Sequence, residues 1–316
     1  MGLALQVLEQ KRHKEATGGC FGGATLPVGD VRDGVGRSKP SWLKMKMPAG
    51  ERFGKMRKLV QENNLHTVCS EAKCPNIGEC WNAGTATLMI LGDTCTRSCG
   101  FCHIKTGRPT WDDPDEPRRV GEAVATMSLG HVVITSVNRD ELPDGGAGIW
   151  AETIRECRRQ SPGTSVEVLI PDFEGNWDAL QLVIDARPDI LNHNMETVPS
   201  QYRWVRPQAK YHRSLKLLQI CKDAGLVTKT GIMLGIGEEE HEIEPAMDDL
   251  LAVGCDILTL GQYLQPTPRH LPVDRWVTPE EFDRWKQIGE AKGFCHVESG
   301  PLVRSSYHAE KQVQTL

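Results

Sequence analysis

Short apolar segments alternate with helical patterns along most of this chain, and this alternation constrains its fold more than any other feature. Six segments have the composition of buried strands: 87–91, 131–137, 165–170, 189–194, 227–234 and 255–261. Helical patterns lie between them, at residues 119–127, 148–159, 176–185, 212–224 and 240–252. Strand then helix, repeated in this way, implies parallel strands joined by right-handed crossovers. The predicted fold class is α/β, a partial (β/α)6 TIM-like barrel, with an open doubly wound sheet as the alternative.

Further segments flank this region. Residues 52–65 show a helical spacing of apolar side chains, and residues 279–292 follow Thr278 as an N-cap, with a proline and two acids at the helix start. A strand-like segment, 294–303, comes after that helix. Residues 1–38 are rich in glycine and polar residues, so they are predicted to be a flexible extension. We expect the N-terminal and C-terminal extensions to cover the mouth of the barrel.

Polar residues follow every one of the six predicted strands. Ligands bind at the carboxyl ends of the strands in parallel α/β folds. One polar residue there is more often the start of a loop, but six such positions on one edge favour a functional site. The residues concerned are Cys95, Asn138, Arg139, Asp140, Asp172, Asn194, Glu196, 235–238, Gln262 and Gln265.

The chain has 11 cysteines in 316 residues, which is too few for a disulfide scaffold. Its first residues lack the long apolar stretch of a secretory leader, so a cytoplasmic location with reduced cysteines is predicted. No stretch approaches the ~18–20 uninterrupted apolar residues of a membrane span, which excludes a transmembrane protein. Reduced cysteines in this number point to metal or redox chemistry.

Cys95, Cys99 and Cys102 form a CxxxCxxC motif directly after the first predicted strand. Three thiolates at this spacing can hold three corners of a cubane iron–sulfur cluster. The fourth iron then stays open and can chelate a small molecule through an amine and a carboxylate. A structural zinc site is the alternative, which would need a fourth ligand such as His103 and normally uses paired CxxC knuckles.

A second cysteine motif and a C-terminal motif lie outside the predicted barrel. Cys69, Cys74 and Cys80 form CxxxxCxxxxxC, a spacing that fits neither a zinc ribbon nor a ferredoxin run. Three cysteines again leave one position for another ligand, and we interpret them as ligands of a second cluster. A zinc site is the alternative, and it has more weight here than it has for the CxxxCxxC motif. Residues 304–309 read RSSYHA; by itself, RSSY is typical of a cap or a turn.

The three motifs, in this order, resemble the lipoyl synthase family of the radical S-adenosylmethionine (SAM) superfamily. Other stretches similar to that family are 39–53, 135–147, 191–199, 230–238 and 299–310. The resemblance covers about residues 38–310. It implies four parts: a flexible N-terminal extension (1–38), an auxiliary-cluster segment (39–85), a radical SAM core (86–275), and a C-terminal helix with the RSSY tail (276–316).

The resemblance implies an enzyme, a sulfurtransferase that inserts two sulfur atoms at C6 and C8 of an octanoyl group carried on a lysine. An aliphatic C–H bond has no acidity that a side-chain base could use, so such a reaction needs radical chemistry, which cofactors carry. In the family, a first 4Fe–4S cluster binds SAM and cleaves it to a 5′-deoxyadenosyl radical that abstracts hydrogen. Carried to this sequence, its ligands are Cys95, Cys99 and Cys102.

The resemblance assigns the second motif to an auxiliary 4Fe–4S cluster whose own sulfides are consumed. Its ligands here would be Cys69, Cys74 and Cys80. A serine of RSSY completes that cluster in the family; we carry this role to Ser306, with Ser305 as the fallback. A serine oxygen matches iron less well than a thiolate does, which suits a cluster that is dismantled during turnover.

Contacts to SAM are predicted at the strand ends. A glycine-rich turn after a strand is common, and polar groups there can simply satisfy the backbone. Asn192 and Glu196 either line the pocket or play that structural role. The predicted cofactor-binding residues are Phe101, Asn138, Asn194, Gly235 and Glu238.

The remaining cysteines are predicted to be bystanders. Cys157, Cys221 and Cys255 fall in predicted helices or a strand, where a cysteine packs as a small apolar residue; Cys20 and Cys295 complete the five. Trp81, beside Cys80, either shields a cluster or packs in the core, and core packing is the preferred interpretation.

The family resemblance also implies partners. They are octanoylated lipoyl carrier domains, such as the glycine cleavage H protein and the E2 subunits of 2-oxoacid dehydrogenases, and a low-potential electron donor such as ferredoxin or flavodoxin. The net charge is −5, yet residues 1–58 are basic, so we expect some of these charges to dock an acidic carrier domain. The lysines concerned are Lys44, Lys46, Lys55 and Lys58.

Two other functions are considered. Other radical SAM sulfur transferases, such as a methylthiotransferase or a biotin synthase relative, lack the combination of the second cysteine motif with RSSY. A zinc-stabilised nucleic-acid-binding protein would need aromatic residues interleaved with the basic ones. The basic region offers only Phe21, Trp42 and Phe53, so we predict neither a nucleic-acid partner nor a membrane partner.

Overall fold

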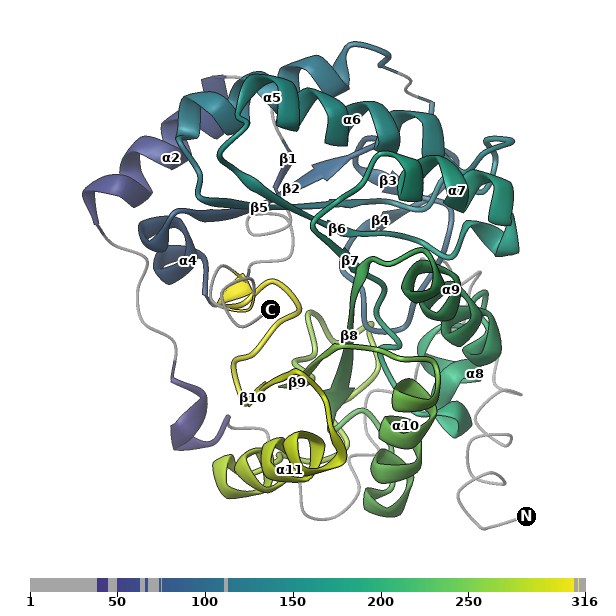
Figure 1. Ribbon diagram of the computed structural model, residues 1–316. Helices are drawn as coiled ribbons and strands as arrows, with labels where there is room; N and C mark the ends of the chain where they lie inside the picture. The colour runs from purple at the N-terminus through teal and green to yellow at the C-terminus, as the bar shows by residue number, and fades with distance from the viewer. Residues whose placement is uncertain are drawn as a thin grey trace.

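A computed structural model describes residues 39–44, 50–62, 66–67, 74, 76–110, 113–309 and 312. At its centre is a curved sheet in which seven strands run parallel in the order β2-β5-β6-β7-β8-β9-β10 (Figure 1). The strands are β2 (Thr85–Ile90), β5 (His131–Ser136), β6 (Ser165–Leu169), β7 (Ile190–Asn192), β8 (Val227–Leu234), β9 (Ile257–Gln262) and β10 (His296–Gly300). A short strand, β1 (His66–Thr67), pairs antiparallel with β2, at the edge of the sheet opposite β10.

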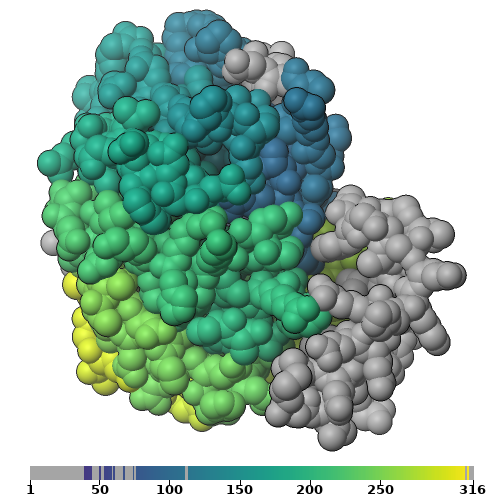
Figure 2. Space-filling model, turned by 90° about the vertical axis from the view of Figure 1, so that its right-hand side faces the viewer, coloured from purple at the N-terminus to yellow at the C-terminus, as the bar shows by residue number. Residues whose placement is uncertain are grey.

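Helices cover the outer, convex face of this sheet (Figure 1). In the space-filling view the teal and green parts of the chain form one continuous surface (Figure 2). The main helices are α2 (Glu51–Glu62), α5 (Glu116–Met127), α6 (Ala147–Gln160), α7 (Trp177–Asp185), α9 (Tyr211–Asp223), α10 (Glu240–Ala252) and α11 (Pro279–Lys292). Shorter elements are α4 (Ile77–Ala83), α8 (Tyr202–Val205), β3 (Thr94–Cys95), β4 (Lys105–Thr106) and the 3-10 turns Ser41–Leu43, Phe173–Gly175 and Pro199–Gln201.

Two apolar clusters hold the helices against the sheet. One packs residues such as Trp150, Ile154 and Leu180 against β5 and β6. The other packs Met247, Phe282 and neighbouring residues against β8 and β9. Because burial of apolar area is the main driving force, these two clusters fix where each helix lies.

The predicted partial barrel is confirmed. The helix predicted at 279–292 is found there: the Thr278 side chain accepts a hydrogen bond from the backbone N–H of Glu281, and Gly293 ends the helix with a left-handed backbone conformation. The sheet has a seventh parallel strand, β10, in the segment that looked only strand-like. The predicted extension at 1–38 lies outside the described residues.

Charged side chains fill the bottom of the barrel, opposite the mouth. Lys229 on β8 places its Nζ 2.9 Å from Oε1 of Glu167 on β6, and both side chains are fully buried. Asn192 donates a hydrogen bond of 3.0 Å to the same carboxylate, and His131 Nε2 lies 3.5 Å from it. A buried charge is tolerated only when it is paired, so these contacts keep the interior polar without leaving a charge alone.

No helix among the described residues is long and apolar enough to cross a membrane.

The Glu167–Lys229 pair yields a stability prediction. Replacing Lys229 with Met leaves a buried carboxylate without its cation, which should reduce the free energy of unfolding by about 3–5 kcal/mol at neutral pH. The double replacement Glu167→Leu with Lys229→Met should recover most of this loss. Lys222→Met is the control, because Lys222 pairs with Asp256 near the surface and should cost less than about 1 kcal/mol. Equal costs for Lys229→Met and Lys222→Met in urea unfolding would contradict the prediction.

The same pair predicts a pH dependence. Burial opposes ionisation of Glu167, but Lys229 and His131 outweigh it and lower its pKa from 4.5 to about 2. Its contribution to stability is therefore present above about pH 4.5 and is lost as the pH falls toward about 2. The gap in unfolding free energy between the native chain and Lys229→Met should narrow when measured at about pH 3.

Candidate active site

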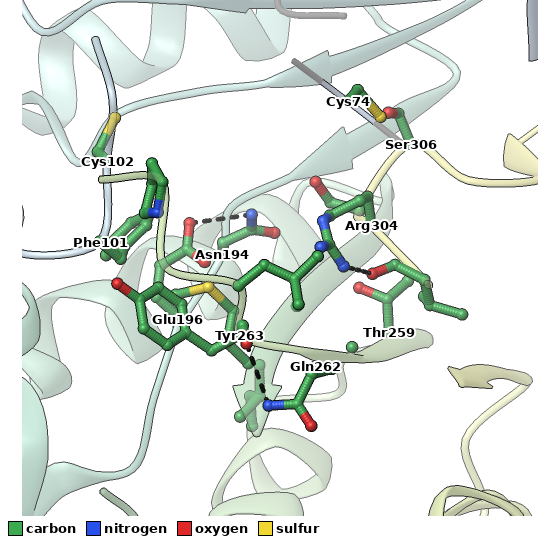
Figure 3. A pocket seen from close by; sticks show the side chains of 18 of the residues that line it. Cys74, Phe101, Cys102, Asn194, Glu196, Thr259, Gln262, Tyr263, Arg304 and Ser306 are labelled. Carbon is green, nitrogen blue, oxygen red and sulfur yellow. Dashed lines mark hydrogen bonds between the residues drawn. The ribbon is translucent and has the colours of Figure 1, made fainter. Parts of the chain in front are cut away.

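A cavity of about 510 Å³ opens at the mouth of the barrel, a volume suited to a small-molecule ligand. Its walls come from strand ends spread over the sheet and from the C-terminal tail (Figure 3). The inward-facing residues are Thr87, Thr135, Leu169, Asn194, Gly231, Met233, Thr259 and Gly261. Gly231 is needed here, because a Cβ at that position would lie 2.7 Å from Thr259 Oγ1 and 2.9 Å from Asn194 Oδ1.

The CxxxCxxC motif forms the loop that leaves β3 at this mouth. Cys95 ends β3, which is held by pairing with β4, and its sulfur accepts backbone N–H groups of Arg97 at 3.4 Å and Asn138 at 3.3 Å. Burial raises the pKa of the Cys99 thiol to about 11 and that of Cys102 to about 12. The Cys95 sulfur contributes to the raised pKa of Cys99, and the Cys99 and Cys95 sulfurs contribute to that of Cys102.

Three thiols in one loop, of which Cys95 is buried and Cys99 and Cys102 are half-buried, fit a bound iron–sulfur cluster, since metal binding takes up thiols as thiolates.

A buried ion network holds one side of the cysteine loop. Arg97 donates two hydrogen bonds to the Asp140 carboxylate, at 2.8 and 2.7 Å, and its Nη2 also lies 2.7 Å from Asp172 Oδ1. Arg213 on α9 reaches the other oxygen of Asp172 at 2.9 Å. Burial opposes ionisation of Asp172, but the hydrogen bond and charge of Arg97 outweigh it and keep its pKa well below the usual range. The loop is thereby fastened to the ends of β5 and β6.

Backbone contacts hold the other side of the loop. The N–H of Gly100 donates to the Val205 carbonyl, and the N–H of Leu271 donates to the Gly100 carbonyl, both at 2.9 Å. His270 Nε2 lies 2.9 Å from the Cys102 carbonyl oxygen. A Cβ at position 100 would lie 2.7 Å from Leu271 and 3.0 Å from the Trp204 carbonyl, so only glycine allows this close approach. The three thiols therefore sit on a loop clamped from both sides.

The residues predicted to contact SAM divide into two groups. Phe101 and Asn194 line the pocket, where the Asn194 amide donates to Glu196 at 3.1 Å (Figure 3). Burial raises the pKa of Glu196, and the buried Asn194 Oδ1 atom has no hydrogen-bond partner among the described residues. Asn138 lies beside Cys95, and its buried Oδ1 likewise has no partner in the described part of the chain. Because Asn194 lines the pocket, a ligand bound there could satisfy its Oδ1 atom.

Gly235 and Glu238 lie elsewhere. They build the turn after β8: the Glu238 carboxylate accepts the backbone N–H groups of Gly235 at 2.7 Å and Ile236 at 3.0 Å. Neither residue lines the pocket, to which the glycine-rich segment contributes Gly231 and Met233 instead. Asn192 is fully buried and does not line the pocket; its amide donates a hydrogen bond to Glu167.

The second cysteine motif and the RSSY tail meet at the same pocket. Cys74, Ser305 and Ser306 all line it, and Figure 3 shows the Cys74 sulfur and the Ser306 hydroxyl directed toward each other. Cys80 lies on α4, which precedes β2. Cys69 lies outside the described residues.

Polar contacts join α4 to the C-terminal tail. Asn76 donates a 2.7 Å hydrogen bond to the Leu302 carbonyl, while Tyr307 and His308 contact Glu79 at 3.2 and 3.3 Å. In Figure 1 the yellow tail lies in the gap between α4 and β10. Segments from both ends of the chain therefore close the open side of the barrel.

The bystander residues behave as expected where they are described. Cys157, Cys221 and Cys255 are buried in the core, and Cys295 is exposed. Trp81 is a buried core residue that packs on Phe53, which confirms core packing. Cys20 lies outside the described residues. Sequence reasoning missed Arg97, because no spacing rule marks a lone arginine as part of a site.

Comparisons with known proteins first define the class. Residues 89–250 match the radical SAM superfamily. Two crystal structures of Streptococcus suis SuiB share the fold: that bound to the precursor peptide SuiA has a TM-score of 0.53 at 12% identity, and that bound to S-adenosylmethionine has 0.51 at 10%. They cover 78% and 69% of this chain, which spans about half the length of each, 52% and 50%. The chain is a member of the radical SAM superfamily.

Closer relatives then give the family. Residues 30–74 match the N-terminal domain of lipoyl synthase of the radical SAM family. The lipoyl synthase of Rubrobacter xylanophilus is 58% identical over 92% of this chain and 90% of its own length. Those of Chlorobaculum tepidum and Bacteroides fragilis are 56% and 55% identical, over 89% and 87% of this chain and 97% and 96% of their own lengths. The chain belongs to the lipoyl synthase family, whose cofactors are SAM and two 4Fe–4S clusters.

The Arg97 network predicts a loss of iron when it is broken. Replacing Arg97 with Met removes the contacts from the cysteine loop to Asp140 and Asp172, so a cluster on that loop should be held poorly. After anaerobic reconstitution, iron should fall from about eight per chain toward about four. Arg97→Lys should retain more iron than Arg97→Met, because lysine keeps the positive charge. It should still retain less than the native chain, because lysine cannot form the bidentate contact with a carboxylate.

The matched control for this experiment is Arg118→Met, on the exposed face of α5. Circular dichroism should show that each variant remains folded. Full iron content in Arg97→Met would contradict the prediction.

Proposed function

We propose that the barrel mouth of this chain is a lipoyl synthase active site in which two 4Fe–4S clusters face one substrate pocket. Lipoyl synthases insert two sulfur atoms at C6 and C8 of an octanoyl group bound to a lysine of a carrier protein. The observation that carries the proposal is that a single pocket is lined by Cys102 from one cysteine motif and by Cys74 and Ser306 from the other two motifs. A reaction that passes sulfur from one cofactor to a carbon radical made by another needs this proximity.

We assign the radical-generating cluster to Cys95, Cys99 and Cys102. Support comes from the clamped loop, whose two-sided attachment holds three thiols at the mouth of the barrel. When bound, the clusters and SAM supply the electron, the hydrogen-abstracting radical and the sulfur atoms. The protein keeps the three thiols in place and surrounds the reacting groups with a mostly apolar wall that excludes water.

We assign SAM contacts to Phe101, Asn194 and Glu196 in the pocket, and to Asn138 beside Cys95. Phe101 offers an apolar surface, and the unpartnered Oδ1 atoms of the two asparagines can accept hydrogen bonds from an amine or a hydroxyl. Gly235 and Glu238 support this wall indirectly, through the turn after β8.

We assign the auxiliary cluster to Cys69, Cys74, Cys80 and Ser306. The support is that Cys74 and Ser306 share one wall of the pocket, while α4 brings Cys80 toward the same region. The inward face of the barrel between the two cysteine groups has threonines, glycines and apolar residues, which suits an octanoyl chain. We infer that this chain lies between the two clusters.

We propose octanoylated carrier domains as the protein substrate, with ferredoxin or flavodoxin as the electron donor. The glycine cleavage H protein and the E2 subunits of 2-oxoacid dehydrogenases are the proposed carriers. Among the described cysteines, Cys95, Cys99, Cys102, Cys157, Cys221, Cys255 and Cys295 are thiols outside any disulfide, which fits a reducing compartment, and we propose the cytoplasm.

The proposed function is tested by anaerobic reconstitution followed by turnover. The native chain should take up about eight irons with matching labile sulfide. With SAM, a reductant and an octanoylated carrier domain, it should form 5′-deoxyadenosine and increase the carrier mass by two sulfur atoms. Bound zinc without labile sulfide would overturn the proposal.

The same assay tests the serine. Ser306→Cys should keep about eight irons but lose sulfur insertion, because a thiolate holds iron more firmly than a serine oxygen does. Ser305→Cys is the matched control and should retain activity. Full activity in Ser306→Cys would show that this serine is not the ligand.

Carrier docking gives a separate prediction. Neutralising Lys44, Lys46, Lys55 and Lys58 together should weaken affinity for an acidic carrier domain several-fold at low salt, with less effect at high salt. Lys44, Lys55 and Lys58 are exposed, and Lys46 lies outside the described residues.

The control for docking is the pair Lys216→Gln and Lys286→Gln, which removes one exposed charge from α9 and one half-buried charge from α11. Binding is measured by surface plasmon resonance at two salt concentrations. Unchanged affinity at low salt in the fourfold variant would refute docking through these lysines.

A further inference from the structure

Arg304, the first residue of RSSY, directs its guanidinium group into the pocket (Figure 3). Its Nη1 donates a 2.6 Å hydrogen bond to the carbonyl of its own neighbour, Val303. No Asp or Glu among the described residues forms an ion pair with it. By contrast, Arg97 pairs with two aspartates and Arg275 with two glutamates.

This arrangement leaves a positive charge in the pocket wall without a counter-charge. Arg304 is half-buried, and Cys74 and Ser306 line the same pocket. A guanidinium does not lose its proton in a protein, so a negative charge bound in this pocket would offset the cost of its partial removal from water. The protein itself offers the Cys74 sulfur, on the side of the pocket where Ser306 also lies.

The fold is built to bring Arg304 to this position. The tail passes directly over β9 at Gly261, where a Cβ would lie 2.2 Å from the Val303 carbonyl oxygen and 3.5 Å from Arg304 Nη1. Asn76 on the α4 side holds the tail through the Leu302 carbonyl. Arg304 is therefore placed by the sheet and by the second cysteine segment together.

We propose that Arg304 is the counter-charge of the auxiliary cluster. This inference rests on the proposed function, which places that cluster on Cys74 and Ser306. A 4Fe–4S cluster held by three thiolates and one serine oxygen is an anion, and a cation beside it favours electron uptake and so raises its reduction potential. Arg304 acts through the cluster and is a positioning residue, not a catalytic one.

The test uses the full-length chain with Cys95, Cys99 and Cys102 replaced by Ala, so that only the auxiliary cluster is loaded, at about four irons per chain. Its midpoint potential is measured by redox titration without SAM, followed by electron paramagnetic resonance. Arg304→Gln should shift the midpoint to a more negative potential, and Arg304→Lys should shift it less. Arg284→Gln is the control, because the exposed Arg284 side chain on α11 pairs with Glu240. This variant should leave the midpoint potential unchanged.

The outcomes separate the alternatives. Loss of iron in Arg304→Gln with retention in Arg304→Lys also supports the proposal, because the charge is then needed to hold the cluster. An unchanged potential and iron content in Arg304→Gln overturns it. The proposal is also overturned if Arg304→Gln leaves the potential unchanged but weakens SAM binding in the otherwise native enzyme. That result would show that Arg304 pairs with the SAM carboxylate. If the chain with Arg304 intact takes up no iron, that result contradicts the proposed auxiliary-cluster site and does not bear on the role of Arg304.

Discussion

The parallel direction of the strands is the constraint on which this structure depends. Because each of the seven strands runs the same way, all of their carboxyl ends meet at one mouth, and every loop that leaves them starts there. The CxxxCxxC loop follows the first of these strands, and Asn194 and Glu196 follow β7. A sheet of this kind with fewer than eight strands stays open on one side. The second cysteine segment and the C-terminal tail occupy that side, which completes the pocket.

Several buried charges inside the barrel are held in ion pairs. Below the pocket, Glu167 and Lys229 neutralise each other, and beside it Arg97 is paired with Asp140 and Asp172. A buried charge without a partner costs several kcal/mol, so complete pairs are expected where no ligand binds. Arg304 forms no ion pair with a described Asp or Glu, and it lies on the wall where the auxiliary cluster is proposed to bind. An incomplete pair in a pocket is thus a guide to the charge of what the pocket holds.

Prediction from sequence succeeded where local chemistry is strong. The helix at 279–292 was placed correctly because Thr278 caps its start and Gly293 ends it, and both effects act within a few residues. It fell short for β10, whose polar His296 and Glu298 alternate with Val297 and do not form the apolar run of a central parallel strand. For Gly235 and Glu238, the sequence indicates a place at the end of a strand, whereas their exact positions depend on how the turn after β8 folds back on its own backbone.

The sequence by itself determined the fold class, the family and the cofactors, because strand–helix alternation and cysteine spacing are properties of neighbouring residues. Only the tertiary structure decided which distant residues face one another. Cys74 and Ser306 share a wall because α4 and the tail close the same gap, and Arg97 meets Asp172 because the ends of β3 and β6 converge. Such contacts join residues far apart in the chain, and their geometry is set by packing of the whole sheet and not by any local preference.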